Sequence, residues 1–354
     1  MKFRATRPER TVNMKQIAQE LGLAVSTVSR ALSNPGRVSK STLSKVSEAA
    51  NRLNYTTNAV ARSLRVGQSR LLMALVPEMQ SSESVVQTLA GIDEALMPRG
   101  YGLLLAHLNR IQSTDRQLFE LACSGLVDGM IMIGPHLNGS ASLQELPLPS
   151  VSLLVDRSAL GVPSVVTDDR AATKTAARHL LDLGHRRFLY IGGQEAEYHE
   201  EERHAGVREA LAEAGLPAAA LRRYPGGFGI ADGEAAARAY LQWRKRPSAV
   251  VCWNDYMAIG FMKTIRDAGL KIPQDVAVTG FDGIEGASYC EPGLTTLAQP
   301  FKTMGAAGAT MLLGIVEGKA LESPLRTVVE SALVVRESTR VPGGRRRDAD
   351  VNRR

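Results

Sequence analysis

The most restrictive feature of this sequence is a pair of short helical patterns separated by a single glycine, Gly22. Residues 14–21 and 25–32 place apolar side chains at helical spacing, so each range predicts a helix of about two turns. Glycine tolerates the backbone conformation of a tight turn. This order predicts a helix-turn-helix motif, whose second helix lies in the DNA major groove. The apolar positions are Ile17, Ala18, Leu21, Val28, Ala31 and Leu32.

The second predicted helix leaves Val25, Ser26, Ser29 and Arg30 facing outward. Arginine can bind guanine bidentately, serine can bond to a base or a phosphate, and valine can contact a thymine methyl group. After a turn at residues 34–36, a third helix capped by a serine at position 39 would cover the first two. The alternative interpretation is a small three-helix domain with no role in DNA binding.

The charge distribution favours the DNA-binding interpretation. Residues 1–70 contain thirteen Lys and Arg against three Asp and Glu, a net charge of +10, although the whole chain carries only +7. The last fourteen residues carry +3, so the middle of the chain carries −6. A run of charge is usually a solvated face, but here the basic block coincides with the motif. We therefore expect double-stranded DNA as a partner.

Composition excludes several other classes of protein. A chain of 354 residues with 44% hydrophobic content can bury a large core in two or three domains. Cys123, Cys252 and Cys290 form no CxxC motif and pair with no His at metal-ligand spacing, so we expect reduced core residues and no metal site. No apolar run approaches the roughly 18 residues of a membrane span. The N-terminus also lacks the apolar core of a signal peptide, so we expect a cytoplasmic protein.

From Leu71 onward, short apolar runs alternate with longer amphipathic segments. This alternation predicts two doubly wound α/β lobes with parallel sheets. Ligands of such sheets bind outside the carboxyl ends of the strands, where the sequence places Asp156, Asn254 with Asp255, and Asp282. A cleft between two lobes suits a small polar ligand. The predicted strands are LLMALV, YGLLLAHL, DGMIMIG, VPSVVT, RRFLYIGG, RRYPGG, AVVCW and DVAVTGF, and the predicted helices are 84–98, 114–124, 169–183, 201–214, 230–244 and 254–268.

Two competing functions receive little support from the sequence. An enzyme of a common class would show a GxSxG elbow, a P-loop or a GxGxxG motif that opens a helix, and the chain has none of them. We therefore expect neither catalysis nor a cofactor. An exported solute-binding protein would share the two-lobed body, but it would carry a signal peptide and no basic headpiece.

The chain resembles the lactose-repressor (LacI/GalR) family of bacterial transcription regulators from residue 13 to about residue 340. The motif TVSRAL together with NY..N..A..L is much more specific for this family than a generic helix-turn-helix pattern. The second lobe matches independently. The matching segments are QIAQELGLAVSTVSRAL, VSKSTLSKVSEAANRLNY, NAVARSL, RGYGLLLA, GLVDGMIM, DDRAATKTAARHLLDLGHRRFLYIGG, REALAEAGLP, WNDYMAIG, GFDG and LTTLAQP.

The resemblance assigns roles to five residues of the recognition helix. It implies that Val25 and Ser26 set the operator preference, that Thr27 and Ser29 contact phosphates, and that Arg30 reads a base. The small side chains at the first two positions suggest an operator that differs from that of the lactose repressor.

The segment from Asn58 to Arg65 matches the hinge helix of the family. In the family this helix folds only on the correct DNA, pairs with its twin and bends the duplex by inserting a leucine into the minor groove. Leu64 holds the leucine position, and Ala61 holds that of the small residue packed against the groove. The alternative for the leucine is an ordinary linker residue.

In the body, the resemblance implies that Asp156, Arg203, Phe228, Asn254 and Asp282 bind an effector. Two carboxylates, an amide, an arginine and an aromatic ring suit a polyhydroxylated ligand. The expected protein is a repressor of carbohydrate-utilisation genes that a sugar or sugar acid releases from its operator. Two alternatives remain: the effector acts as a co-repressor, or the chain is a solute-binding protein without a DNA function.

Some of these residues also have a purely structural interpretation: Asp282 as the cap of a turn and Phe228 as a core residue. The neighbouring Asp255 is interpreted as a helix cap.

Several positions depart from the family pattern. Ala24 replaces a helix-capping serine, Thr57 replaces the hinge proline, and residues 77–82 lack the usual aromatic pair, which suggests a smaller, more polar or anionic ligand. The unusual residues 199–202 are interpreted as a solvated helix start. No leucine heptad follows residue 340 and the tail at 343–347 is basic, so we expect a homodimer on a near-palindromic operator rather than a tetramer.

The expected domains are a headpiece at 1–57, a hinge helix and linker at 58–69, a body at 70–340 and a basic disordered tail at 341–354. Within the body, lobe 1 is expected to comprise about 70–167 with 299–328, and lobe 2 about 168–298 with 329–340.

Overall fold

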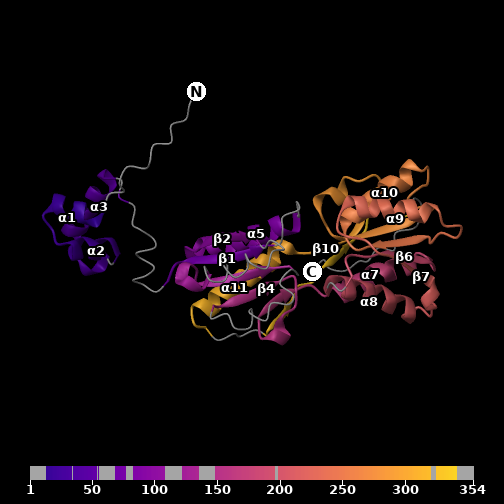
Figure 1. Cartoon of the computed structure of the whole chain (residues 1–354), viewed down its shortest axis with the longest axis horizontal. Coiled ribbons are helices and arrows are strands. Elements are labelled where there is room, and N and C mark those ends of the chain that lie inside the picture. Colours follow the sequence, from indigo (N-terminus) through magenta and orange to yellow (C-terminus); the bar gives the residue numbers. More distant parts are fainter. Residues whose placement is uncertain are drawn as a thin grey trace, which may run out of the picture. The chain divides into compact units, whose positions relative to one another are not determined.

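The computed structural model of the chain divides into two compact units, Met1–Ser69 and Arg70–Arg354 (Figure 1). We call the first unit the headpiece and the second the body. The structure describes residues 13–33, 35–53, 55, 68–76, 83–107, 122–134, 148–195, 198–319 and 324–340.

The headpiece is helical, as the sequence predicted. Helix α1 (Met14–Leu21) begins at a capping box in which Asn13 accepts from the Gln16 backbone, and it ends at Gly22, whose φ of 63° is left-handed. Helix α2 (Val25–Ser33), the short 3-10 helix η1 (Pro35–Arg37) and helix α3 (Lys40–Arg52) follow. The predicted serine cap of α3 is present, because the Ser39 side chain accepts from the Thr42 backbone. The buried core side chains are Ile17, Ala18, Val28, Ala31, Val46, Ala49 and Ala50.

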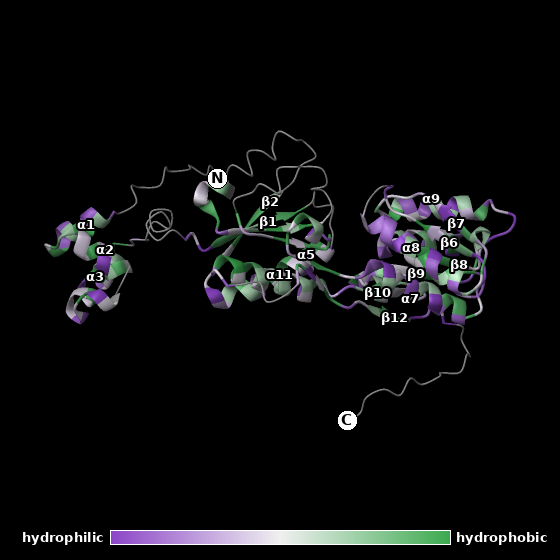
Figure 2. Ribbon diagram, turned by 90° about the horizontal axis from the view of Figure 1, so that it is seen from below, coloured by the Kyte–Doolittle hydropathy of each residue, from purple (hydrophilic) through white to green (hydrophobic). Residues whose placement is uncertain are grey.

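The body contains two six-stranded sheets, and each defines one lobe. Lobe 1 has the order β11-β5-β4-β3-β1-β2, with every strand pair parallel. Its strands are β1 (Leu71–Val76), β2 (Gly102–His107), β3 (Gly129–Ile133), β4 (Ser150–Leu153), β5 (Ser164–Val166) and β11 (Arg326–Val328). The strands β1 and β2 are coloured as hydrophobic in Figure 2; β1 is buried along almost its whole length, whereas β2 is an edge strand on which Leu105 is exposed.

Lobe 2 has the order β12-β10-β9-β8-β6-β7, and only the β10–β12 pair is antiparallel. The chain passes from the first sheet to the second after β5, returns after β10 and crosses again after β11. The doubly wound architecture with two lobes, predicted from the alternation of patterns, is confirmed. The strands are β6 (Phe188–Ile191), β7 (Leu221–Tyr224), β8 (Ala249–Cys252), β9 (Ala277–Asp282), β10 (Thr295–Ala298) and β12 (Ala332–Val334).

Helices pack on the sheets in close pairs. Helices α5 (Glu83–Leu96) and α11 (Phe301–Val316) contact each other beside the first sheet, while α7 (Asp169–Asp182) pairs with α8 (Tyr198–Glu213) and α9 (Ile230–Leu241) with α10 (Asp255–Asp267). Figure 1 shows the α7–α8 pair and the α9–α10 pair on opposite faces of the second sheet. A Cβ at Gly233 would lie 1.9 Å from a backbone oxygen of α10, so the approach of α9 to α10 requires a glycine there.

Most of the predicted elements are present, but the sequence analysis did not predict the strands β4, β10, β11 and β12 or the helix α11. The helix predicted at 201–214 begins earlier, at Tyr198. Most of the helix predicted at 114–124 lies outside the described residues. The structure describes its end, where Ala122–Leu126 form a π-helical turn. Of the three cysteines, which are free, only Cys252 is buried; Cys123 is exposed, so its assignment to the core was wrong.

In the described part of the chain, no helix is long and apolar enough to cross a membrane. The same residues contain no cluster of three or more His, Cys, Asp or Glu that could hold a metal ion.

Candidate functional site

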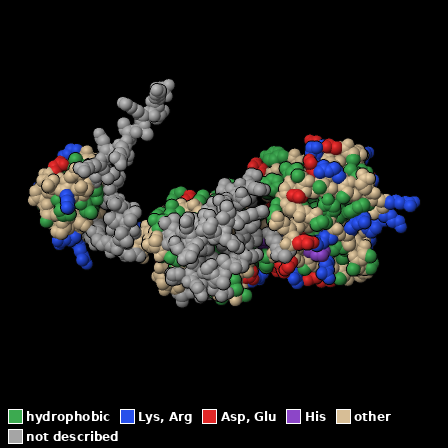
Figure 3. Space-filling model, viewed as in Figure 1, with side chains coloured by type: hydrophobic (Ala, Val, Ile, Leu, Met, Phe, Trp, Pro, Cys, Tyr) green, Lys and Arg blue, Asp and Glu red, His purple; other side chains and the backbone are tan. Residues whose placement is uncertain are grey.

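The candidate DNA-reading face is the outer side of helix α2. Val25 is 41% exposed, Ser26 and Arg30 are exposed, and Thr27 and Ser29 are half-buried. The opposite side of the helix is closed into the headpiece core, so these are the side chains that α2 can offer to a partner. Lys and Arg side chains are visible on the headpiece surface in Figure 3.

Helix α2 begins without a side-chain cap at Ala24. The Ala24 carbonyl accepts from the backbone N–H groups of Thr27 and Val28 at 2.9 and 3.2 Å, but an alanine side chain offers no acceptor for the first turn. The other predicted DNA contacts, Asn58, Ala61 and Leu64, lie outside the described residues, as does Thr57.

In the body, Arg203 is the centre of a buried polar cluster in lobe 2. Its Nε donates to Asp169 Oδ2 at 2.8 Å and its Nη1 donates to the Trp253 carbonyl at 2.6 Å. The guanidinium carbon lies 4.6 Å from the Trp253 ring centre and 3.7 Å from that of Phe281. Stacking and hydrogen bonding therefore hold Arg203 in one orientation.

Asp282 lies beside Arg203 at the end of β9. Its Oδ1 is 3.9 Å from Arg203 Nη2, and it accepts from Gln299 Nε2 at 2.9 Å. Burial raises the pKa of Asp282 above its usual value, although Arg203 opposes that shift. The residue has a φ of 109°, a conformation that side chains rarely adopt and that tends to occur at functional sites.

Asn254 and Phe228 join the same cluster. Asn254 is only 4% exposed; its Nδ2 donates to the Phe228 carbonyl at 2.9 Å, and its Oδ1 accepts from the Met257 backbone at 2.8 Å as the N-cap of α10. The Phe228 ring packs edge to face on Trp253, with 4.9 Å between centres. Four of the five predicted effector residues thus form one connected group around Arg203 and Trp253.

Asp156, the fifth predicted residue, belongs to lobe 1. Its Oδ2 pairs with Arg326 Nε at 2.8 Å, and its Oδ1 accepts from the backbone and hydroxyl of Ser158 at 2.9 and 2.6 Å. Burial acts to raise the pKa of Asp156, but the bonds from Ser158 and the charge of Arg326 outweigh it and lower the pKa. The pKa of Tyr198 is raised to about 12, mainly by burial and then by the negative charges of Asp169, Glu202 and Asp156. Tyr198 therefore lies within electrostatic range of carboxylates from both lobes.

The sequence reasoning missed two central members of the cluster, Asp169 and His199. His199 Nδ1 lies 2.8 Å from Asp169 Oδ2, the oxygen that also binds Arg203. Burial alone would raise the pKa of Asp169, but Arg203 and His199 outweigh it and hold the pKa far below its usual range. The aspartate follows β5, so the search for polar groups at strand ends could have found it after VPSVVT.

The interpretation of residues 199–202 as a solvated helix start was wrong for His199 and Glu200, whereas Glu201 is exposed and Glu202 is half-buried. His199 is 9% exposed and Glu200 is 3% exposed. The Glu200 carboxylate accepts from the Tyr190 hydroxyl at 2.9 Å and from the Gly193 backbone at 2.7 Å, and it pairs with Arg223 at 2.9 Å. Tyr190 lies on β6, Gly193 in the loop after β6 and Arg223 on β7, so these contacts bury the Glu200 side chain at the start of α8.

Asp255 has a different role from the helix cap that the sequence suggested. Asn254 is the cap, whereas the fully buried Asp255 side chain accepts from the backbone N–H groups of Gly283 and Ile284 at 2.8 and 2.9 Å and from the Thr296 hydroxyl at 2.6 Å. Burial, followed by the charge of Asp282, raises the pKa of Asp255 to about 7.

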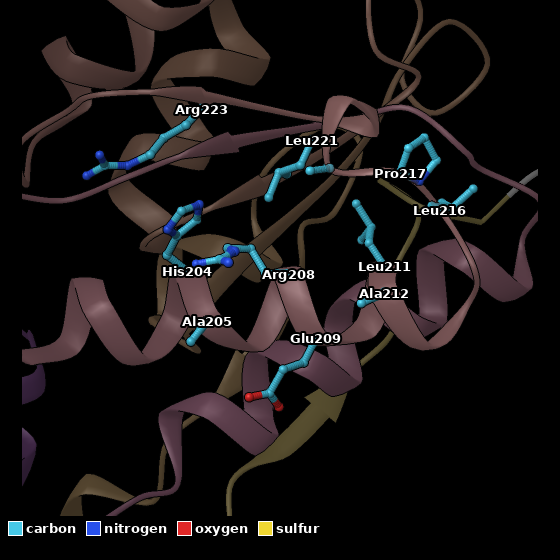
Figure 4. Close-up of a pocket in the computed structure, with 11 residues that line it drawn as sticks. His204, Ala205, Arg208, Glu209, Leu211, Ala212, Leu216, Pro217, Leu221 and Arg223 are labelled. Atoms are coloured by element: carbon cyan, nitrogen blue, oxygen red, sulfur yellow. The ribbon is translucent and has the colours of Figure 1, made fainter.

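A separate groove of about 520 Å³ lies between α8 and β7, the edge strand of lobe 2 (Figure 4). Arg208, His204 and Arg223 lie toward one end of it, and Leu216 and Pro217 lie at the other. None of the predicted effector residues lines this groove, so it is distinct from the polar cluster around Arg203.

Comparisons with known families match two regions of the chain. Residues 13–58 match the family described as bacterial regulatory proteins, lacI family, and residues 177–339 match a periplasmic binding protein-like domain. The chain is 30% identical to the HTH-type transcriptional repressor CytR of Escherichia coli (strain K12), over 96% of this chain and 99% of that protein. It is also 30% identical to the repressor PurR of Vibrio parahaemolyticus, over 87% of this chain and 93% of that protein.

Two solved structures are similar along most of the chain. The Lac repressor dimer bound to operator and the anti-inducer ONPF superposes with a TM-score of 0.83 at 25% identity, covering 93% of this chain and 99% of that one. The transcriptional regulator CelR in complex with cellobiose superposes with a TM-score of 0.69 at 28% identity, covering 92% of this chain and 99% of that one.

Proposed function

The chain belongs to the lacI family of bacterial regulatory proteins, which are DNA-binding transcriptional repressors and not enzymes, and we propose that it represses carbohydrate-utilisation genes until a sugar or sugar acid binds between its lobes. The observation that carries this proposal is the cluster of Arg203, Asp282, Asn254 and Phe228 at the strand ends of lobe 2. Strand ends are where ligands bind in sheets of this type.

The chemistry of the cluster favours a ligand with several hydroxyl groups. The Oδ2 oxygen of Asp282 accepts no hydrogen bond from the part of the chain that the structure describes, and an acceptor of this kind suits a sugar hydroxyl. Arg203 commits two N–H groups to Asp169 and Trp253, and its Nη2 stands 3.9 Å from Asp282, too far for a hydrogen bond. A ligand hydroxyl would fit between those two groups, because it can accept from Arg203 and donate to Asp282. The Phe228 ring would cover an apolar face of the sugar.

Asp156 would contribute the second carboxylate from the opposite lobe. Its contacts with Arg326 and Ser158 keep it ionised, which is the state that accepts hydrogen bonds from hydroxyl groups. His199, oriented by Asp169, is a further candidate contact. The similar protein CelR has been solved with cellobiose, and that supports a sugar as the class of effector.

For the headpiece, we propose that Val25, Ser26 and Arg30 read bases and that Thr27 and Ser29 contact phosphates. The outward orientation of α2 supports these roles, since its exposed side carries the first three residues. Asn58, Ala61 and Leu64 remain proposed hinge contacts in the minor groove.

We propose a homodimer that binds a near-palindromic operator in the cytoplasm, where the DNA is. The similar Lac repressor has been solved as a dimer on its operator. A two-fold dimer presents two headpieces to two half-sites. We also propose the domain bounds 1–57, 58–69, 70–340 and 341–354, which the division after Ser69 supports.

The proposed sign of regulation is induction. An effector that prefers the conformation with low DNA affinity by about 1 to 3 kcal/mol releases the repressor, whereas the opposite preference would make it a co-repressor. A mobility-shift titration of the operator complex with the effector distinguishes the two: weaker complexes support induction, and tighter complexes show co-repression.

The effector can be found by a thermal-shift screen of the full chain against monosaccharides, sugar acids and polyols. A ligand at about 100 times its Kd stabilises the folded state by about 2.7 kcal/mol, which is readily measured as a higher Tm. Asp282→Asn should abolish the shift, while Asp267→Asn, an exposed aspartate of α10 paired with Lys263, should retain it. A shift that survives Asp282→Asn would contradict the proposed site.

A further inference from the structure

Three consecutive backbone N–H groups follow Asp282, and two carboxylates accept hydrogen bonds from all three. Asp255 Oδ2 accepts from Gly283 and Ile284 at 2.8 and 2.9 Å. The two oxygens of Glu83 accept from Glu285 at 3.1 and 3.0 Å. Asp255 begins α10 in lobe 2, whereas Glu83 begins α5 in lobe 1. The turn at 283–285 is therefore held from both lobes.

Glu83 is itself fixed in place by two further contacts. Gln87 Nε2 donates to Glu83 Oε1 at 2.7 Å, one helical turn along α5. Burial raises the pKa of Tyr256, and a hydrogen bond from the Glu83 backbone acts against that shift, which places the tyrosine hydroxyl on the first residue of α5. Tyr256 follows Asp255 directly, so adjacent residues of α10 hold the turn and contact lobe 1.

Asp255 has little freedom to move within its site. The Thr296 hydroxyl donates to its Oδ1 at 2.6 Å, and a Cβ at Gly280 would lie only 2.1 Å from that oxygen. The carboxylate is thus enclosed between α10, β9 and β10. The three N–H groups of the turn at 283–285 are bonded to Asp255 and Glu83. A shift of the turn must therefore strain the hydrogen bonds to Asp255, to Glu83 or to both.

We propose that Asp255 and Glu83 form an inter-lobe clamp on the turn at 283–285, and that this clamp makes the position of Asp282 depend on the position of lobe 1. The link to regulation rests on the proposed function, since it takes Asp282 to be an effector contact. Helix α5 follows β1, which begins two residues after the headpiece unit ends at Ser69. Glu83 is therefore a positioning residue through which occupancy of the cleft reaches the lobe that carries the headpiece.

Backbone amide exchange, followed by NMR on the full chain without ligand or DNA, tests the clamp. Glu83→Ala removes the acceptor of Glu285, so its amide should exchange about tenfold faster or more. The amides of Gly283 and Ile284 should also exchange faster, although their own acceptor, Asp255, is intact. Faster exchange at Glu285 alone would show two independent hydrogen bonds and would overturn the clamp, as would unchanged exchange at all three.

Two variants separate the clamp from a general loss of structure. Glu83→Gln keeps an amide oxygen that can accept from Glu285, so it should restore slow exchange at the turn. Glu94→Ala removes another glutamate of α5, which pairs with Lys302 on the surface at 2.9 Å, and should leave the turn unchanged. If Glu94→Ala accelerated exchange at 283–285 as strongly as Glu83→Ala, the effect would belong to α5 as a whole and the clamp would be wrong.

The consequence for DNA binding is measured separately, on duplexes that the wild-type chain enriches from a random-sequence library. Glu83→Ala should change the affinity for the enriched duplex several-fold, whereas Glu83→Gln and Glu94→Ala should not. An unchanged affinity alongside accelerated exchange would overturn the coupling to lobe 1. Failure of the wild-type chain to enrich any sequence would contradict the proposed function, while the exchange comparison still decides the clamp.

Discussion

Replacing Asp255 with Asn should flatten the dependence of folding stability on pH between about 4 and 7. The pKa of Asp255 rises from 3.8 to about 7, because the carboxyl is buried and Asp282 is close. The folded chain therefore binds this proton more tightly than the unfolded chain does. The stabilising contribution is complete below the unfolded pKa, declines as pH rises and is lost once pH passes the folded pKa.

The magnitude follows from the size of the shift. One pKa unit corresponds to about 1.36 kcal/mol, so these two values predict that the wild-type chain loses about 2 to 3 kcal/mol of unfolding free energy between pH 5 and pH 8 from this group. Asn resembles the protonated acid: its oxygen can accept from Gly283 and Ile284, and its amide can donate to Thr296. The variant should therefore lack this loss and should be the more stable protein at pH 8.

Urea unfolding of the full chain at pH 5, 6, 7 and 8 measures this difference, with Trp243 and Trp253 as fluorescent reporters. Asp267→Asn is the matched control, since that aspartate is exposed on the same helix and pairs with Lys263 at 2.8 Å. Exposed pairs of this kind contribute less than about 1 kcal/mol, so the control should follow the wild-type slope. Equal slopes for wild type and Asp255→Asn would refute the assignment of the raised pKa to this carboxyl.

Four other substitutions test the packing and the DNA-reading face. Asp169→Asn leaves the buried Arg203 without its carboxylate partner and should lower the unfolding free energy by about 3 to 5 kcal/mol; a loss below about 1 kcal/mol would show that the pair is not coupled. Gly233→Ala places a Cβ 1.9 Å from a backbone oxygen and should destabilise the body by about 1 to 3 kcal/mol, whereas Gly314→Ala meets no atom within 4 Å and should stabilise α11 by up to about 1 kcal/mol. Opposite signs in thermal unfolding are the expected result, and equal losses would contradict it. Arg30→Ala should weaken binding to the enriched duplex by about 1 to 3 kcal/mol and relax the preference at one base pair, while an equal loss on all sequences would mean that it contacts only phosphate.

Local patterns were sufficient for the headpiece. Ile17, Val28 and Val46 each belong to an apolar pattern of helical spacing, in α1, α2 and α3 respectively, and all three are fully buried in the headpiece core. Gly22 marks the turn because a positive φ is accessible to glycine without a steric cost. These features depend on neighbours within a few residues along the chain, so the sequence alone determined the helix-turn-helix motif.

The same reasoning determined the class of the body but not the contacts in its cleft. Alternating apolar runs predicted two doubly wound sheets, and strand ends identified Asn254 and Asp282. They did not show that Asp169 pairs with Arg203, or that His199 is buried rather than solvated.

The contacts of Asp255 depended most on the tertiary structure. From the sequence it was a helix cap, because it stands at the start of an amphipathic segment. Its actual partners are the turn that follows β9 and the Thr296 hydroxyl on β10. The order of the sheet places β9 beside β8, which leads into α10, and β10 on the other side of β9. The sequence by itself determined the family, the helices of the headpiece and the two-lobed α/β class of the body, since these follow from local periodicity and motif spacing. The tertiary structure decided which buried charges meet, since burial and pairing depend on residues far apart in the chain.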